Sequence, residues 1–550
     1  MPPAGGLPIW RPGSAVPTAW LRGWATAVAG GSLSPCDTSL RRPSYGSSTA
    51  PTVTKTPPVG PPTASACWPP CSPRADHQHP QTPTERRYFV SNQPPYQVTN
   101  PATGEVLATF PYAGDAEIEQ ALASAVDAQN AWAARSVEER AGVLTAVADA
   151  FDAKADELAK LVTTEMGKKL SSAAGEARFA AAIFRYYATE GPALLADQPL
   201  SAPGSDVAVV QRRPIGVVLG VMPWNYPYYQ VARFAAPNLL VGNTVLIKHA
   251  ENCPWSSAAI ADLLSEAGVP AGAFANVYAT FDQIGSLIAD FRIQGVSVTG
   301  SERAGAAVAA QAGRHLTRVV LELGGSDPYV VLDAEDPAAA ARDAWRIRMS
   351  NMGQACNSNK RMIVSRDIHD QFLASLIEQA TSLKPGDPTD LGADEFAPVV
   401  SRAAALTLRD QITDAVEKGA TLHVGGTLAE GPGAYIAPAV ISGVTEQMRI
   451  YHEEVFGPVA VVYPVDSDEE AVRLANDIRY GLGGSVFSTD EKRAAEVAQR
   501  LECGMAHVNT FSAETPEMPF GGTKASGFGR ELGALGIDEF TNKRLYYVAR

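Results

Sequence analysis

The sequence predicts an α/β fold built on parallel β-sheets. From residue 215 onward, short runs rich in β-branched residues alternate with Ala- and Leu-rich runs of helical pattern. Such alternation is typical of parallel strands joined by crossover helices. The first series has the pattern of a doubly wound, dinucleotide-binding sheet, and a second series runs from about residue 327 to 540. The first series contains the strand candidates NTVLIKHA (243–250), ANVYAT (275–280), GVSVTG (295–300) and RVVLELGG (318–325).

Turn and cap signals predict the elements before this series. YQVTNPATGEVLATF (96–110) holds two β-type runs around a Pro/Gly turn, which indicates a hairpin. VAVVQRRPIGVVLGVM (207–222) reads as an extended ribbon that runs into a buried strand, and RLYYVAR (544–550) is a candidate edge strand. Three helices are expected in between, from Asp115 as a cap before Ile118, Leu122 and Val126, from the capping box at 136–139, and over 173–187.

The first 84 residues differ in composition from the rest. They contain 17 of the 41 prolines and show no hydrophobic period, so they cannot bury enough surface to offset chain entropy. We expect a disordered, Pro-rich extension. Two readings of it stay open, a transit peptide and upstream sequence translated from a mis-assigned start, whereas a signal peptide lacks its apolar core.

Charge and cysteine content exclude several classes of protein. The whole chain has a net charge of −14. The extension carries six Lys and Arg against Asp37 and Asp76, a net charge of +4, so the remaining residues carry −18. An acidic body argues against nucleic acid as a partner, and the longest apolar runs fall far below the roughly 20 residues that span a bilayer. Six sparse, irregularly spaced cysteines argue against disulfides and a metal site, and favour the cytoplasm.

Several polar residues follow predicted strands or turns, where ligands of parallel sheets bind. They are Asn225 in MPWNYP, Lys248 and Glu251 in IKHAE, Glu322 in LELGG, Cys356 in NMGQACNSNK and Glu454 in EEVFGP. Each alone has a structural explanation, such as a turn residue, a solvated strand end or a small buried thiol. Gly300 and Ser301 in TGSERAG could offer a helix start to a phosphate or form a simple N-cap.

Together these residues form a known pattern. MPWNYP, GNTVLIKHAE (242–251), TGS, LELGGSDP (321–328), GQAC, EEVFGPV (453–459) and PFGGTKASGFGRELG (519–533) resemble, in order and spacing, the aldehyde dehydrogenase superfamily. The match covers roughly residues 88–550, and LELGGSDP and YPYYQVARFAAP are most similar to the succinate-semialdehyde dehydrogenase branch. The resemblance implies a Rossmann-type NAD-binding domain, an α/β catalytic domain and a small β oligomerisation ribbon.

The resemblance also implies catalytic roles. Cys356 as thiolate would attack an aldehyde, and the amide of Asn225 with the Cys356 backbone N–H would hold the oxyanion. Hydride would then pass to the nicotinamide and leave a thioester. Glu322 would activate the water that releases the carboxylic acid.

Cofactor contacts follow from the same resemblance. Lys248 and Glu251 would bind the adenine ribose, since a carboxylate there accepts the 2′-hydroxyl but repels a 2′-phosphate, which favours NAD while NADP stays open. The other expected contacts are Trp224, Gly300, Ser301, Glu454 and Phe456.

Substrate choice is divided. Arg233 resembles the arginine that binds the substrate carboxylate in semialdehyde enzymes, with a helix-surface arginine as the alternative, and Arg348 is a second candidate. Glu514, where the branch tends to have serine, would repel an anionic tail. From the resemblance and Arg233, the expected reaction is oxidation of an aldehyde such as succinate semialdehyde. A non-carboxylated aliphatic or aminoaldehyde, or a non-catalytic NAD-binding relic, is the alternative.

A Cys/His hydrolase is a rival that leaves the nicotinamide motifs unexplained. The resemblance also implies a homodimer or homotetramer, in which the ribbon pairs with a neighbour's C-terminal strand and so covers an otherwise unpaired strand edge. The predicted boundaries are 1–84 for the extension, 85–198 and 215–324 for the NAD-binding domain, 199–214 for the ribbon, 325–540 for the catalytic domain and 541–550 for the C-terminal strand.

Overall fold

The structure is a computed structural model that describes residues 95–550. The predicted disordered extension, with its two interpretations, lies outside the described residues. From residue 95 onward, no helix is both long enough and apolar enough to cross a membrane.

Six strands form the first sheet, in the order β21–β9–β8–β5–β6–β7. Neighbouring strands are parallel except β21 with β9. The predicted runs 243–250, 295–300 and 318–325 are confirmed as β6, β8 and β9, whereas the run 275–280 overlaps β7 only at its first two residues because that strand ends at Asn276. The strands are β5 (Val217–Val221), β6 (Thr244–Lys248), β7 (Phe274–Asn276), β8 (Ile293–Thr299), β9 (Arg318–Glu322) and β21 (Gly527–Phe528).

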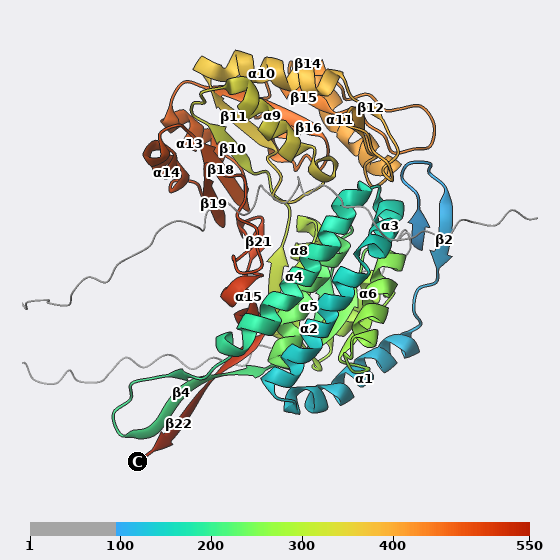
Figure 1. The fold of residues 1–550 in the computed structure, drawn as a ribbon, viewed down its shortest axis with the longest axis vertical. Coiled ribbons are helices and arrows are strands. Elements are labelled where there is room, and N and C mark those ends of the chain that lie inside the picture. Colours follow the sequence, from blue (N-terminus) through green and yellow to red (C-terminus); the bar gives the residue numbers. More distant parts are fainter. Residues whose placement is uncertain (1–94) are drawn as a thin grey trace, which may run out of the picture. The chain divides into compact units, whose positions relative to one another are not determined.

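Helices cover both faces of this sheet (Figure 1). Val217 and Leu219 of β5 point into one apolar cluster and Val218 into the other, as the period of two in a strand requires. Both faces are therefore buried, which explains why these strands are continuously apolar. One face packs against α1 (Asp115–Ala134), α7 (Phe281–Ala289) and α8 (Glu302–His315). The other packs against α2 (Val137–Ala153), α3 (Ala155–Met166), α4 (Leu170–Leu194), α5 (Pro227–Val241) and α6 (Pro254–Glu266).

Seven strands form the second sheet, in the order β14–β15–β16–β11–β10–β18–β19. β14 is antiparallel to β15 and the other pairs are parallel. The strands are β10 (Pro328–Val331), β11 (Arg361–Ser365), β14 (Thr421–Val424), β15 (Ala439–Ser442), β16 (Val459–Val465), β18 (Gly483–Phe487) and β19 (Met505–Val508). One face packs against α9 (Pro337–Arg348) and α10 (Arg366–Thr381). The other packs against α11 (Arg402–Glu417), α12 (Arg449–His452), α13 (Asp468–Asn476) and α14 (Glu491–Ala498).

A third, antiparallel sheet consists of β3 (Gln198–Pro199), β4 (Ser205–Pro214) and β22 (Thr541–Ala549). β22 pairs with β4 of its own chain along its whole length (Figure 1). α15 (Gly533–Glu539) packs against α5 and leads directly into β22. β22 is the outer strand of this sheet, so pairing of the ribbon with a neighbour's C-terminal strand stays a prediction. Leu545, Tyr546 and Tyr547 stay 45–62 % exposed on this ribbon, so a homo-oligomer through it stays a prediction.

Smaller elements agree with the turn and cap signals. β1 (Tyr96–Thr99) and β2 (Val106–Phe110) form the predicted hairpin. Ser136 Oγ accepts the Glu139 N–H at 3.1 Å, and Glu139 accepts the Ser136 N–H at 2.7 Å, which confirms the capping box. α1 begins at Asp115, but its cap is Gly114. The remaining elements are η1 (Ser350–Gly353) and the two-residue pairs β12 (Lys384–Pro385) with β13 (Glu395–Phe396) and β17 (Tyr480–Gly481) with β20 (Thr523–Lys524).

Each large sheet with its covering helices forms one layer of the molecule, and one segment of the chain crosses from the second layer back to the first. This segment contains β21 and α15, which lie in the range 325–540 predicted for the catalytic domain but contact the first layer. The predicted domain boundaries stay predictions.

Candidate active site

The carboxyl ends of the first sheet gather several predicted site residues. Lys248 lies opposite the last residue of β5, and Glu322 lies opposite the last residue of β8. Asn225 follows β5 and Ser301 follows β8. All four therefore lie at the sheet edge where doubly wound folds bind ligands.

Cys356 reaches this edge from the second layer, on the loop between η1 and β11. Asn225 Nδ2 donates to the Gln354 carbonyl at 3.1 Å, and Asn351 Nδ2 donates to the Asn225 carbonyl at 3.1 Å. Asn351 and Met352 have φ values of 47° and 54°, a left-handed conformation that costs roughly 1–2 kcal/mol per residue. The hydrogen bonds to Asn225 hold this strained loop in place.

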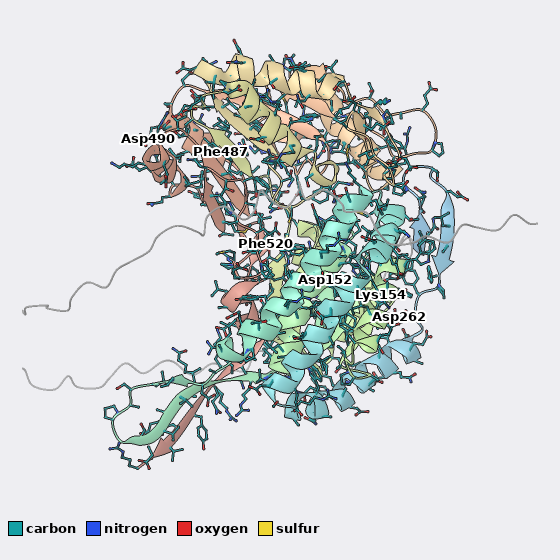
Figure 2. The ribbon with its side chains drawn as sticks, viewed as in Figure 1. Asp152, Lys154, Asp262, Phe487, Asp490 and Phe520 are labelled. Atoms are coloured by element: carbon teal, nitrogen blue, oxygen red, sulfur yellow. The ribbon has the colours of Figure 1, made fainter. Side chains whose placement is uncertain are left out.

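Cys356 lines a cavity of about 250 Å³. Aromatic rings from Phe179, Tyr226, Tyr229 and Phe520 line it too. Figure 2 shows Phe520 on the segment that returns from the second sheet toward the first. The volume lies below the roughly 300–1,000 Å³ of ordinary ligand clefts, which favours a short substrate.

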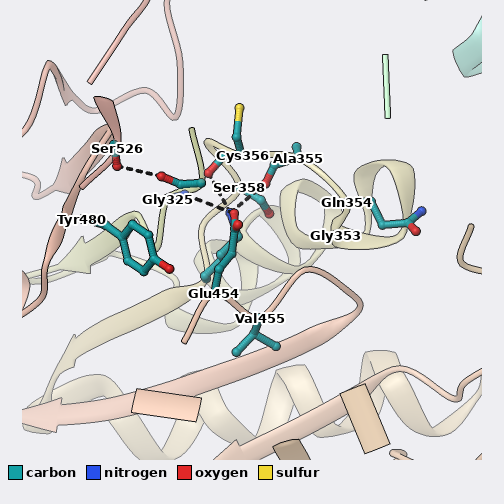
Figure 3. A network of polar contacts seen from close by, with 12 residues as sticks. Gly325, Gly353, Gln354, Ala355, Cys356, Ser358, Glu454, Val455, Tyr480 and Ser526 are labelled. Atoms are coloured by element: carbon teal, nitrogen blue, oxygen red, sulfur yellow. Dashed lines mark hydrogen bonds and ion pairs between the residues drawn. The ribbon is translucent and has the colours of Figure 1, made fainter. Parts of the chain in front are cut away.

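Burial controls the thiol. It raises the pKa of Cys356 to about 12, while Arg233 and Lys360 act in the opposite direction and Glu454 and Glu514 add to the rise. A cysteine acts as a nucleophile only as thiolate, so Cys356 would have to lose this proton before it could attack a substrate. Figure 3 shows the sulfur pointing away from Glu454.

Asn225 presents an amide donor beside the loop of Cys356. Its side chain is buried, and one of its two amide N–H bonds donates to the Gln354 carbonyl, two residues before Cys356. A primary amide has a second N–H. That donor can therefore serve a negative oxygen bound beside the sulfur.

Glu322 is buried, and both of its carboxylate oxygens lack a hydrogen-bond partner among the described residues. Burial raises its pKa well above the usual range; Arg233 opposes this and Glu531 adds to it. A Cβ on Gly521 would lie 2.6 Å from Glu322 Oε1, so glycine leaves the room that the carboxyl occupies. A buried carboxyl with a raised pKa suits a general base.

Glu454, Phe456 and Trp224 lie together beyond the nucleophile. Trp224 and Phe456 stack edge to face with ring centroids 5.6 Å apart. Glu454 Oε1 accepts the Gly325 N–H at 3.1 Å and pairs with Lys360 Nζ at 3.1 Å (Figure 3). A Cβ on Gly325 would lie 2.6 Å from the Cys356 carbonyl oxygen. The backbone therefore packs tightly between carboxylate and nucleophile.

The other end of the edge fits a dinucleotide. Lys248 Nζ pairs with Glu251 Oε1 at 2.6 Å, and Lys248 is 3 % exposed, so a solvated strand end is the wrong interpretation. Ser301 caps α8, with its Oγ accepting the Ala304 N–H. At Gly300 a Cβ would meet no atom within 4 Å. The start of α8 is thus open to an anion, and Glu251 can accept ribose hydroxyls.

Arg233 is buried and does not line the cavity. It pairs with Glu531, lies within hydrogen-bond distance of Tyr229 and Thr299, and faces the rings of Tyr229 and Phe520. The alternative of a helix-surface arginine is therefore wrong. Tyr229 and Phe520, whose rings the guanidinium faces, line the cavity, whereas Arg233 does not.

Arg348 does not reach the cavity either. It donates to the carbonyls of Val455 and Val459 at 2.7 and 2.8 Å and to Ser358 Oγ at 2.8 Å. Burial lowers its pKa to about 9. Its donors are taken by the chain itself, so Arg348 supports the nucleophile loop and the structure does not support a substrate contact.

Two site lysines were missed in the sequence. Lys168 lines the cavity, pairs with Glu176 and donates to the Asn225 carbonyl at 2.7 Å. Lys360 lies under the nucleophile loop. A lysine directly before an apolar strand run such as RMIV was a usable signal for Lys360, whereas nothing local marks Lys168.

Comparisons with known proteins agree with this geometry. Residues 89–545 match the model of the aldehyde dehydrogenase family. A succinate-semialdehyde dehydrogenase [NADP(+)] of Deinococcus radiodurans is 49 % identical over 82 % of this chain and 94 % of its own length.

Two solved structures extend the comparison. The succinic semialdehyde dehydrogenase of Streptococcus pyogenes with NADP+ has a TM-score of 0.80 and 40 % identity, over 83 % of this chain and 100 % of that one. The betaine aldehyde dehydrogenase of Staphylococcus aureus with NAD+ has a TM-score of 0.79 and 30 % identity, over 82 % of this chain and 91 % of that one.

Proposed function

The chain belongs to the aldehyde dehydrogenase family, and we propose that it oxidises a short semialdehyde such as succinate semialdehyde to the acid, with NAD preferred over NADP. The observation that carries the reaction is the position of Cys356, which opens into the cavity while Asn225 contacts its loop. The names of its relatives support the substrate, but the same names give NADP+ as the cofactor of those proteins. The preference for NAD rests on the carboxylate of Glu251 alone.

The chain's own residues supply most of the chemistry. Cys356 attacks the aldehyde carbon as a thiolate, and the amide of Asn225 holds the resulting oxyanion, which one such donor stabilises by roughly 3–4 kcal/mol. Lys248, Glu251 and the start of α8 hold the dinucleotide, with Trp224, Glu454 and Phe456 around its nicotinamide end. A nicotinamide cofactor held there would supply the acceptor for the hydride that leaves the substrate carbon. Glu322 takes a proton from the water that hydrolyses the thioester of Cys356.

A second candidate substrate is a non-carboxylated aldehyde. The charged residues that line the cavity are Lys168, Glu176 and Glu514. Lys168 and Glu176 pair with each other. Glu514 accepts a hydrogen bond from the Tyr229 hydroxyl, and among residues 95–550 it forms no ion pair. The lining therefore carries one excess negative charge, which favours an uncharged or cationic tail over a carboxylate.

A kinetic screen tests the proposal. We expect succinate semialdehyde to give a higher kcat/KM than butanal and 4-aminobutanal, with NAD and NADP each supplied in turn and the reduced cofactor followed by absorbance. A higher value for 4-aminobutanal would move the assignment to the second candidate. No turnover with any aldehyde and either cofactor would refute the reaction.

Glu251→Ser tests the cofactor assignment. We expect the ratio of kcat/KM for NADP to that for NAD to rise at least tenfold, because removing a carboxylate near a 2′-phosphate removes a repulsion of roughly 1–4 kcal/mol at 4 Å. The measurement is initial rate against cofactor concentration. Glu266→Ser, a surface carboxylate on α6, is the control and should leave the ratio unchanged. A wild type that already prefers NADP would overturn the assignment.

Glu514→Gln tests the charge of the cavity. Removing this carboxylate should raise kcat/KM for succinate semialdehyde about tenfold and leave butanal, of equal chain length but uncharged, within about twofold. Glutamine keeps a hydrogen-bond acceptor for Tyr229. Equal changes for both aldehydes would show that Glu514 acts on the fold of the loop and not on the charge of the substrate.

A further inference from the structure

Lys360 links the loop that carries Cys356 to the carboxylate of Glu454. Its ammonium donates to the carbonyls of Ala355 and Cys356, at 2.7 Å each, and pairs with Glu454 Oε1 at 3.1 Å. An ammonium has three donors, and these contacts use all three. Figure 3 shows Ala355, Cys356 and Glu454 around this point. We propose that Lys360 is a positioning residue: when the cofactor contacts Glu454, Lys360 changes the orientation and ionisation of Cys356 in response.

The contacts form a closed ring. Glu454 Oε1 receives both Lys360 and the Gly325 N–H. Gly325 in turn packs so closely against the Cys356 carbonyl that a Cβ would lie 2.6 Å from it. A shift of the Glu454 carboxylate therefore moves the Cys356 peptide from two sides, through Lys360 and through Gly325.

Burial argues against a merely structural lysine. The Lys360 side chain is 0 % exposed, whereas that of Glu454 keeps 19 %. Burying an ammonium costs several kcal/mol unless it is paired, and an apolar residue would fill the space at lower cost. Because Glu454 Oε1 is taken, Oε2 is the atom that can meet a ligand hydroxyl. The inference rests here on the proposed function, in which Glu454 contacts the nicotinamide end of the cofactor.

The charge of Lys360 also acts on the sulfur. The charged groups around the thiol are Arg233 and Lys360, which favour the thiolate, and Glu454 and Glu514, which oppose it. Removing Lys360 leaves Arg233 as the remaining cation of this set and leaves Glu454 without its ion-pair partner. Both changes make the thiol harder to ionise.

The test is alkylation of Cys356 by iodoacetamide in the full-length protein, followed by mass spectrometry across a range of pH, with and without NAD. In the wild type we expect NAD to change the alkylation rate. In Lys360→Met we expect the rate at neutral pH to fall about tenfold, which corresponds to a one-unit shift of the thiol titration to higher pH. NAD should then have no effect. Lys360→Arg should restore most of both properties.

Two controls keep the test decisive. Cys253 is fully buried, so its alkylation reports unfolding. If Lys360→Met unfolds, Glu454→Gln breaks the same link from the other side and must abolish the effect of NAD. An unchanged NAD effect in either folded variant, with an unshifted pH profile, overturns the proposal. Absence of aldehyde turnover in a wild type whose alkylation responds to NAD would refute the proposed function and leave this link standing.

Discussion

Replacing Cys356 by serine should lower kcat/KM for every aldehyde by at least about 10⁴-fold. The nucleophile and its partner residues act as a unit, so loss of the nucleophile alone removes most of the rate enhancement. Serine keeps the size of the side chain. Its hydroxyl ionises far less readily than even a thiol with a pKa of about 12, so the variant lacks an attacking anion. The measurement is the rate of cofactor reduction under saturating NAD, first with succinate semialdehyde and then with butanal.

A matched cysteine provides the control. Cys503 is half-buried and contacts the Met505 carbonyl at 3.2 Å, but it does not line the cavity with Cys356. Cys503→Ser should keep kcat/KM within about twofold, as expected for a substitution outside the site. An unchanged thermal transition would show that Cys356→Ser is folded. Substantial activity in that folded variant would place the nucleophile elsewhere.

The sequence was most informative where function depends on local motifs. Asn225 follows β5 and Glu322 ends β9, and parallel strands share one carboxyl edge, so the proximity of these two residues could be predicted without coordinates. Cys356 belongs to the second layer, and the family resemblance alone linked it to them. Strands β6, β8 and β9 of the first sheet were also predictable, because burial on both faces leaves a continuous apolar signature.

Side-chain orientation was not predictable in the same way. Arg233 and Arg348 were both expected in the site because guanidinium suits a carboxylate. The structure instead pairs Arg233 with Glu531 and surrounds Arg348 with carbonyls. Which face of a helix meets a cavity depends on packing between layers far apart in the sequence, and no local pattern records it.

Distant pairing limited the other predictions. The partner of β22 depends on where α15 packs, more than 300 residues after β4. Lys168 lies 57 residues before Asn225, whose carbonyl it contacts. Unlike Lys168, Glu514 was singled out in the sequence, because its charge would oppose an anionic substrate. The structure adds that Glu514 lines the cavity together with Cys356.

Glu322→Gln should separate the two halves of the reaction. Attack by Cys356 and hydride transfer do not consume the carboxylate, whereas hydrolysis of the thioester needs a base for water. We therefore expect a burst of about one reduced cofactor per subunit, followed by steady turnover slowed by roughly 10²–10⁴-fold. Stopped-flow absorbance measures both phases, and mass spectrometry should detect the acyl group on Cys356 during the slow phase.

The direction in which turnover changes with pH is a second test of Glu322. Burial raises the pKa of Glu322 well above its usual range, against the opposing effect of Arg233, and a general base works only when deprotonated. Turnover of the wild type should therefore fall as pH drops through that raised pKa, well above the value of about 4.3 for a free glutamate. The slow turnover of Glu322→Gln should lack this acidic limb, while Glu335→Gln, an exposed carboxylate, should keep it. A variant without a burst would place Glu322 before hydride transfer, as the acceptor of the Cys356 proton, since a thiol with its pKa raised to about 12 needs one.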